Sequence, residues 1–230
     1  MSRKKRIPWN KGLSKFNNSS IAKISKTLSN KPRSNFYLWQ LENRKKYAIF
    51  DKNEKLAELI GVVLGDGHIE KFPRTERLII SSNSNNTGFI KRYSEIVELL
   101  FNKKPLLMKS YNENCVRISI YEKFISKRLG IPCGNRKNFN AVIPRWILKD
   151  RKQVLAYLRG LYEAEGSFSV HKPTSTYKLF FSNKNDSLLN NVFYLLELLG
   201  LHPHKSQYKI QLSRKKEVEV LKSWIKFRDY

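Results

Sequence analysis

The sequence predicts an α+β protein made of two similar halves, each with the element order αββαββα. Two stretches repeat at an offset of 99 residues, and each is followed by period-two alternation of apolar and polar residues and by amphipathic helical patterns. The expected boundaries are residues 51–140 for the first half and 141–230 for the second, after a basic extension over residues 1–50.

The extension carries much of the positive charge. The chain has 45 Lys and Arg against 19 Asp and Glu, a net charge of +26, and residues 1–50 hold 13 of the basic residues and one acid. Repulsion between so many positive charges destabilises a folded protein, so this charge indicates a polyanionic partner. Nucleic acid is the more frequent partner of such a surface, and an anionic membrane is the less frequent one. We expect an arm that follows DNA; a solvated leader is the alternative.

No membrane or secretory segment is expected. No apolar run approaches the roughly 20 residues that span a bilayer, and the basic start at 1–8 has no apolar stretch behind it. Cys115 and Cys133 are expected to be reduced. These features predict an intracellular protein, in the cytoplasm or an organelle matrix.

Each half is expected to open on a helix that begins at a capping box. The boxes are Asp51 with Glu54, and Asp150 with Gln153. The helical stretches that follow are LAELIGVVLGDGHI (56–69) and LAYLRGLYEAEGSF (155–168). The later elements of the first half are expected as strands 67–72 and 77–82, helix 87–101, strands 106–111 and 115–120, and helix 122–129; those of the second are strands 167–172 and 177–182, helix 186–200, strands 204–207 and 208–213, and helix 215–227.

Small residues and one acid repeat within the two opening helices. Gly61 and Gly65 are four residues apart, as are Gly160 and Ala164, so each pair lies on one helix face. Since an interior Gly weakens a helix by about 0.5–1 kcal/mol, we expect the two faces to pack in close backbone contact. Asp66 and Glu165 would then lie side by side, which favours a hard divalent cation between them and hence phosphodiester hydrolysis.

At these residues the sequence resembles the LAGLIDADG homing endonucleases of the single-chain, two-motif type. The motifs read LIGVVLGDG (59–67) and LRGLYEAEG (158–166), and the stretch 143–147 is also similar to family sequence. The resemblance implies a β saddle over the DNA major groove. It also implies that Mg²⁺ or Mn²⁺ is held by Asp66 and Glu165, with help from the carbonyls of Gly65 and Ala164. The stretches 7–13 and 21–25 resemble modular DNA-binding motifs attached to homing nucleases.

The resemblance further implies a basic catalytic residue near the end of the second strand of each half. In the second half this is Lys184, whereas Asn83 stands at the aligned position of the first. The active site is therefore expected to be asymmetric, with Lys71 or another base as a substitute.

Strand alternation predicts the DNA-binding face. Phe168, Val170 and Tyr208 are expected to point inward with the other apolar strand residues. Polar residues of the opposite face, or of strand ends, are expected to contact bases or phosphates. In the first half these are His68, Glu70, Arg74, Arg77, Ser81, Asn83, Lys109, Arg117 and Ser119; in the second they are Ser167, Ser169, His171, Lys172, Lys178, Ser182, Asn183, Lys205, Lys209 and Gln211.

The sequence therefore predicts a monomeric, Mg²⁺-dependent, intron-encoded endonuclease that cuts double-stranded DNA at a specific site. Two alternatives remain on the same fold: an intron maturase that binds RNA, and a regulator that binds DNA without cutting it.

Overall fold

The computed structural model describes residues 8–30, 47, 49–110, 113–136 and 139–230. The chain forms two compact units, residues 1–46 and 47–230. In the described part of the first unit, helix α1 (Ser19–Ser29) begins at the N-cap Asn18, whose side chain accepts hydrogen bonds from the amides of Ser20 and Ile21, and none of its residues is buried. Residues 1–7, 31–46 and 48 of the expected extension, which include Ile7 of its modular motif, lie outside the described residues.

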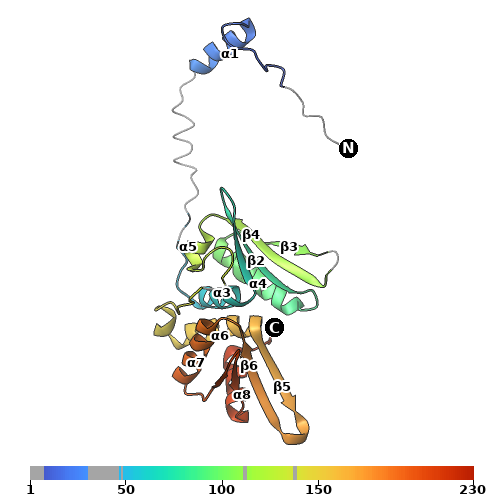
Figure 1. Cartoon of the computed structure of the whole chain (residues 1–230), viewed down its shortest axis with the longest axis vertical. Helices are drawn as coiled ribbons and strands as arrows, with labels where there is room; N and C mark the ends of the chain where they lie inside the picture. The colour runs from blue at the N-terminus through green and yellow to red at the C-terminus, as the bar shows by residue number, and fades with distance from the viewer. Residues whose placement is uncertain (1–7, 31–46, 48, 111–112, 137–138) are drawn as a thin grey trace. The chain divides into compact units, whose positions relative to one another are not determined.

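The unit 47–230 contains the two predicted halves (Figure 1). The first half runs α3 (Glu54–Gly65), β1 (Gly67–Lys71), β2 (Glu76–Asn83), α4 (Thr87–Phe101), β3 (Leu106–Lys109), β4 (Cys115–Glu122) and α5 (Ile125–Leu129). The second runs α6 (Arg151–Glu165), β5 (Gly166–His171), β6 (Thr176–Ser182), α7 (Asp186–Leu198), β7 (His204–Ser206), β8 (Lys209–Leu212) and α8 (Lys215–Ile225), with short 3₁₀ turns at Ile147–Lys149 and Lys172–Thr174. The predicted αββαββα order is confirmed in both halves.

Each half folds its four strands into one antiparallel sheet. The strand orders are β1-β2-β4-β3 and β5-β6-β8-β7, so the two sheets have the same topology. In the first sheet, Leu78 pairs with Ile120 and Ile80 with Ile118, and these buried residues share the face that the helices cover. Leu179 and Leu212 pair in the same way in the second sheet. The opposite face of each sheet is left uncovered by helices.

The two opening helices pack directly on each other in the middle of the unit (Figure 1). A Cβ on Gly61 would lie 3.1 Å from the Cα of Gly160, and one on Gly160 would overlap the carbonyl oxygen of Glu58. The predicted close backbone contact is confirmed. Because both helices end at this interface, it fixes where their C-terminal acids lie.

The helix starts differ from the capping-box prediction. Helix α3 begins at Asn53, whose side chain accepts from the Leu56 amide at 3.0 Å, so the assignment of Asp51 as the cap was wrong. An extended residue directly before the first turn satisfies these amides, and Asn53 occupies that place. Asp150 caps α6 as predicted, but the Gln153 side chain donates to the Lys52 carbonyl instead of returning to Asp150.

Three apolar residues that were expected to point inward are open to solvent. Phe168 is 36% exposed, Val170 37% and Tyr208 50%. Phe168 and Val170 belong to the β5–β6 hairpin, which Figure 1 shows extending beyond the helices, so its inner face has little to pack against; Tyr208 lies in the turn between β7 and β8. The Lys222 ammonium covers the Phe168 ring at 3.6 Å from the centroid instead.

Candidate active site

The two motif acids lie at the C-terminal ends of the central helices. Asp66 is the C-cap residue of α3, and Glu165 is the last residue of α6. A Cβ on Gly65 would lie 3.1 Å from the Glu165 Cγ, so Glu165 packs against the residue that precedes Asp66. The packing of α3 on α6 therefore brings together the two carboxylates that the sequence singled out.

The pKa values of both motif acids are raised. Burial, followed by the negative charge of Glu165, raises the pKa of Asp66 from 3.8 to about 6. Burial also raises the pKa of Glu165, and a hydrogen bond from the Asn183 side chain opposes this shift. Since Asp66 also has solvent access, a cation could reach it from one side. A divalent cation bound to both carboxylates would favour their ionised forms.

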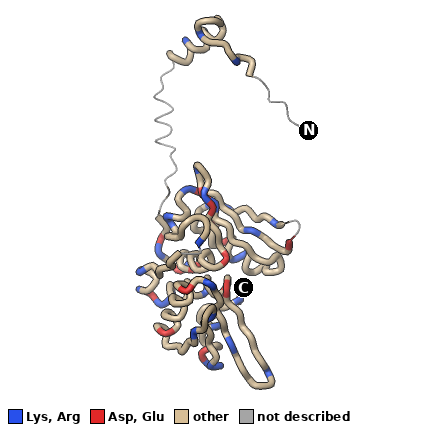
Figure 2. The backbone as a smooth tube through the Cα atoms, in the orientation of Figure 1, with Lys and Arg blue, Asp and Glu red and all other residues tan. Residues whose placement is uncertain are grey.

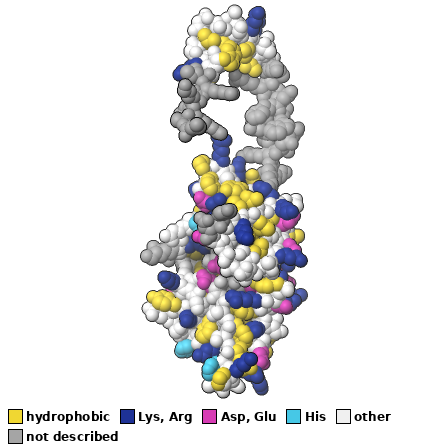
Figure 3. Space-filling model, turned by 90° about the vertical axis from the view of Figure 1, so that its right-hand side faces the viewer, with side chains coloured by type: hydrophobic (Ala, Val, Ile, Leu, Met, Phe, Trp, Pro, Cys, Tyr) yellow, Lys and Arg dark blue, Asp and Glu magenta, His cyan; other side chains and the backbone are white. Residues whose placement is uncertain are grey.

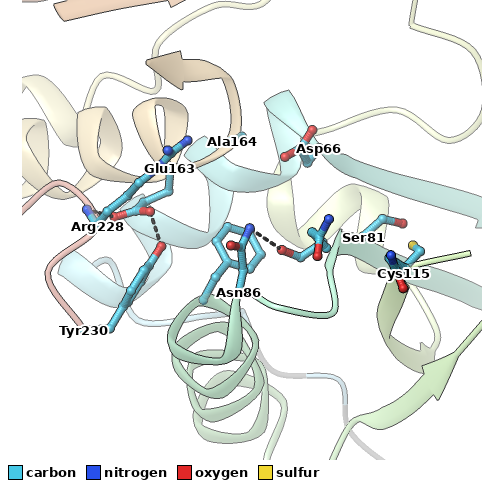
Figure 4. Close-up of a pocket in the computed structure, with 12 residues that line it drawn as sticks. Asp66, Ser81, Asn86, Cys115, Glu163, Ala164, Arg228 and Tyr230 are labelled. Atoms are coloured by element: carbon cyan, nitrogen blue, oxygen red, sulfur yellow. Dashed lines mark hydrogen bonds between the residues drawn. The ribbon is translucent and has the colours of Figure 1, made fainter. Parts of the chain in front are cut away.

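The two acids differ in their neighbours. The Asn183 amide donates to the Glu165 carboxylate at 2.9 Å. A cavity of about 410 Å³ lies beside Asp66, lined by amide and hydroxyl side chains that include Ser81 and Asn86 (Figure 4). Asp66 therefore faces an open, polar cavity, whereas the Glu165 carboxylate has a side-chain hydrogen-bond partner.

The expected catalytic lysine and its first-half counterpart stand at equivalent distances along the chain from the paired strands, although Asn83 is the last residue of β2 and Lys184 lies two residues beyond the end of β6. Gly67 pairs with Ile80 in one sheet, and Gly166 pairs with Phe181 in the other. Counting three residues on from each partner gives Asn83 and Lys184. Lys184 is exposed just before α7.

Most of the predicted DNA-contacting residues lie on the uncovered faces of the sheets. Strand register places there His68, Glu70, Arg77, Ser81, Asn83 and Arg117, and Ser167, Ser169, His171, Lys178, Ser182, Lys209 and Gln211. Arg74 and Lys172 are exposed in the hairpin turns of the two halves. The alternation rule missed His204, which pairs with Gln211 and shares its face.

The structure corrects three of these assignments. Lys109 pairs with Val116, so strand register places it on the helix-covered side of the first sheet and not on the uncovered face. Ser119 is on the uncovered face but only 1% exposed, so its hydroxyl is not available at the surface. Lys205 pairs with Ile210 and therefore lies on the helix-covered side. Its ammonium binds Asp186 at 2.7 Å and Asn190 at 2.6 Å, which leaves it poorly placed for a phosphate.

One arginine of the uncovered face is already held in place. Arg77 donates to Glu70 at 2.5 Å and to the Tyr121 hydroxyl at 3.0 Å. Its guanidinium also lies 5.5 Å from the centre of the Tyr121 ring. These contacts fix the direction of Arg77 before any ligand is present.

Comparison with known proteins gives the class of the fold. Residues 152–221 match the model of the LAGLIDADG-like domain. The structure resembles mesophilic variants of the homing endonuclease I-DmoI, with a TM-score of 0.55 and 18% identity over 77% of this chain and 97% of that one. It also resembles I-DmoI in complex with DNA and Mn (TM-score 0.52, 20% identity, 75% and 96% of the two chains).

A third similar structure is the N-terminal LAGLIDADG domain of DUF199/WhiA, with a TM-score of 0.51 and 16% identity over 78% of this chain and 84% of that one. A curated relative, the replication factor C small subunit of Methanocaldococcus jannaschii, is 26% identical over 163 residues; the match covers 68% of this chain and 8% of that protein's length. The chain therefore contains a LAGLIDADG-like domain and has the two-half LAGLIDADG fold, as the motifs predict.

Proposed function

We propose that this protein is a site-specific endonuclease that hydrolyses both strands of double-stranded DNA with divalent cations bound at Asp66 and Glu165. The observation that carries the proposal is the pair of carboxylates at the closely packed ends of α3 and α6, with their raised pKa values. Acids that repel each other within a strongly basic protein are explained by a cation that binds between them.

The residues present suit a hard cation. Asp66 and Glu165 supply carboxylate oxygens, and the backbone carbonyls of Gly65 and Ala164 lie next to them in sequence. Among the described residues no group of three or more His, Cys, Asp and Glu could hold a metal, so two acids would leave room for water and DNA phosphate oxygens. A bound Mg²⁺ or Mn²⁺ would polarise the scissile phosphate and lower the pKa of a metal-bound water.

Lys184 is the proposed basic residue of the second active centre. It follows Asn183, whose side chain binds Glu165, so a lysine at this point is close to the acid. Its ammonium would stabilise negative charge that develops on the phosphate. Asn83 cannot supply that charge in the first half, so we expect the two strands to be cut at different rates.

The uncovered sheet faces form the proposed DNA surface. Residues 51–230 carry 32 basic and 18 acidic residues. Lys and Arg positions are distributed along both halves (Figure 2), and basic side chains are spread over the face seen in Figure 3. Arg77, Arg117 and Gln211 are of the types that read base edges in the major groove. Strand-end residues such as Arg74 and Lys172 would bind phosphates.

The described part of the extension is consistent with an additional DNA contact. Lys11, Lys15, Lys23 and Lys26 lie in or near α1, and no acid accompanies them. We include residues 1–50 in the proposal as a DNA-binding extension. The part of the chain that the structure describes has no helix long and apolar enough to cross a membrane.

A cleavage assay tests the function. Plasmids that carry randomised inserts are incubated with the purified protein and Mg²⁺, and linearised molecules are sequenced at their ends. Recovery of one recurrent sequence supports a site-specific nuclease. Asp66→Asn and Glu165→Gln should abolish cleavage but keep binding in Ca²⁺, with Asp186→Asn as a surface control. Binding to a specific DNA without cleavage would favour a regulator, and preference for a folded intron RNA would favour a maturase.

One chain supplies both acids, so the proposed enzyme acts as a monomer. A DNA substrate also agrees with the expected intracellular location.

A further inference from the structure

Two arginines outside the motifs, one in each half, donate hydrogen bonds to equivalent backbone carbonyl oxygens. Arg136 donates a hydrogen bond to the carbonyl oxygen of Gly67, and Arg228 donates to that of Gly166 at 3.1 Å. These glycines end the two motifs, one residue after Asp66 and Glu165. Each arginine comes from the segment that follows the last helix of its own half, α5 or α8.

Arg136 makes a two-pronged contact with the end of α3. Besides Gly67, its guanidinium donates to the Val63 carbonyl at 2.7 Å. The last carbonyls of a helix lack partners within the helix and form the negative end of its dipole. Arg136 therefore satisfies both sides of the turn that carries Asp66.

Arg136 is not held by an acid. The described residues offer it no carboxylate within ion-pair distance, and burial alone lowers its pKa. A buried guanidinium without a carboxylate is costly unless its hydrogen bonds are needed where it lies. The contacts it does make are the carbonyls on either side of Asp66.

Both the backbone and the side chain of Arg228 make hydrogen bonds. Its amide donates to the Glu163 carboxylate at 2.8 Å, and the Tyr230 hydroxyl also binds Glu163. Figure 4 shows these three residues together at one side of the cavity, with Asp66 across from them. The backbone of Arg228 has φ of 53°, a left-handed conformation that is unfavourable for a residue with a side chain. The local structure thus directs the guanidinium toward Gly166.

We propose that Arg136 and Arg228 are a pair of positioning residues, each of which holds the turn that carries one of the two metal-binding acids. This inference rests on the proposed nuclease function and extends it to residues that neither motif contains. Neither arginine contacts a carboxylate of the metal pair; each acts through the backbone of the adjacent glycine. Arg136 makes two bonds and is half-buried, whereas Arg228 makes one and is exposed, so Arg136 has the larger role.

The test compares Arg136→Gln, Arg136→Lys, Arg228→Gln and a matched control, Arg151→Gln. The control removes the same charge at the start of α6, where Arg151 lies over the Trp224 ring, far from Glu165. Each variant cuts a duplex labelled differently on its two strands, over a range of Mg²⁺ concentrations. Binding of the same duplex in Ca²⁺ verifies that the variants are folded.

We expect Arg136→Gln to raise the Mg²⁺ concentration for half-maximal cleavage about tenfold and to slow one strand about 10- to 100-fold, the range for loss of a group that orients a metal ligand. Arg228→Gln should slow the opposite strand by a smaller factor. Lys can reach only one carbonyl, so Arg136→Lys should recover part of the rate. The control should behave as the unmodified protein.

Equal slowing of both strands by each Gln variant, with unchanged Mg²⁺ dependence, would overturn the proposal, because loss of general stability has no strand preference. An unmodified protein that cuts no DNA would instead contradict the nuclease function. In that case, the arginine proposal is tested by measuring how much Mg²⁺ raises the free energy of unfolding of each protein in the absence of DNA. Stabilisation that is weaker in Arg136→Gln than in the control supports it, while equal stabilisation, or none in any protein, overturns it.

Discussion

Replacing Asp66 by Asn should stabilise the metal-free protein at pH 8. The folded-state pKa of Asp66 is raised from 3.8 to about 6, so the folded protein binds the proton more tightly than the unfolded chain does. The stabilisation that comes from this proton is complete below pH 3.8 and is lost as the pH rises through 6. At pH 8 the folded state therefore carries the full cost of the ionised carboxylate, and the neutral amide removes it.

The size of the effect follows from the pKa values. A change from 3.8 to about 6 corresponds to about 3 kcal/mol. Because Asp66 is also open to solvent, screening reduces this figure, and we expect about 1–1.5 kcal/mol at pH 8. At pH 5 most of the folded protein already holds the proton, so the gain from Asn should be smaller.

Urea unfolding at pH 5 and pH 8 measures the difference between the two proteins, so groups that titrate equally in both cancel. Asp186→Asn is the control of opposite sign, because Lys205 lowers the pKa of Asp186 and its removal should not stabilise the protein at pH 8. Mg²⁺ at ten times its dissociation constant should stabilise the unmodified protein by about 1.4 kcal/mol and Asp66→Asn by much less. A destabilising Asp66→Asn at pH 8, or a gain independent of pH, would contradict the raised pKa of Asp66 and the cost of its ionised carboxylate.

Three further predictions concern the interface, the basic residue and the surface. Gly160→Ala should destabilise the protein by about 2 kcal/mol in urea unfolding, because its Cβ overlaps the Glu58 carbonyl; an unchanged midpoint would contradict the close packing. Lys184→Met should slow cleavage of one strand about 100-fold but leave DNA binding in Ca²⁺ unchanged, and equal loss on both strands would exclude a local role. The logarithm of DNA affinity should fall with that of salt concentration by about 0.9 per neutralised phosphate, and a flat dependence would remove the basic surface from the binding model.

The fold could be predicted from the sequence because the same unusual helix residues occur in both copies of the repeat. Gly61 and Gly160 weaken their own helices, so their recurrence at a fixed offset pointed to a shared cause, and the structure shows that cause as contact between α3 and α6. The positions of the strands along the chain followed from alternation of apolar residues, which is a local property. Features that depend on what lies above a strand, such as the exposure of Phe168 or the burial of Ser119, could not be predicted from alternation alone.

The supporting residues of the site were hidden for a different reason. Asp66 and Glu165 are recognisable because the motif places them at a fixed distance from the small helix faces. Arg136 and Arg228 lie 69 and 62 residues after the glycines they bind, and the two distances differ, so no repeat relates them. What relates them is the acceptor. Each guanidinium donates to the carbonyl of the glycine that follows the motif acid, and each arginine comes from the last segment of its own half. Arginines that approach the end of an opening helix from the last segment of each half are therefore worth seeking in other two-half structures of this fold, even where sequence spacing gives no indication of them.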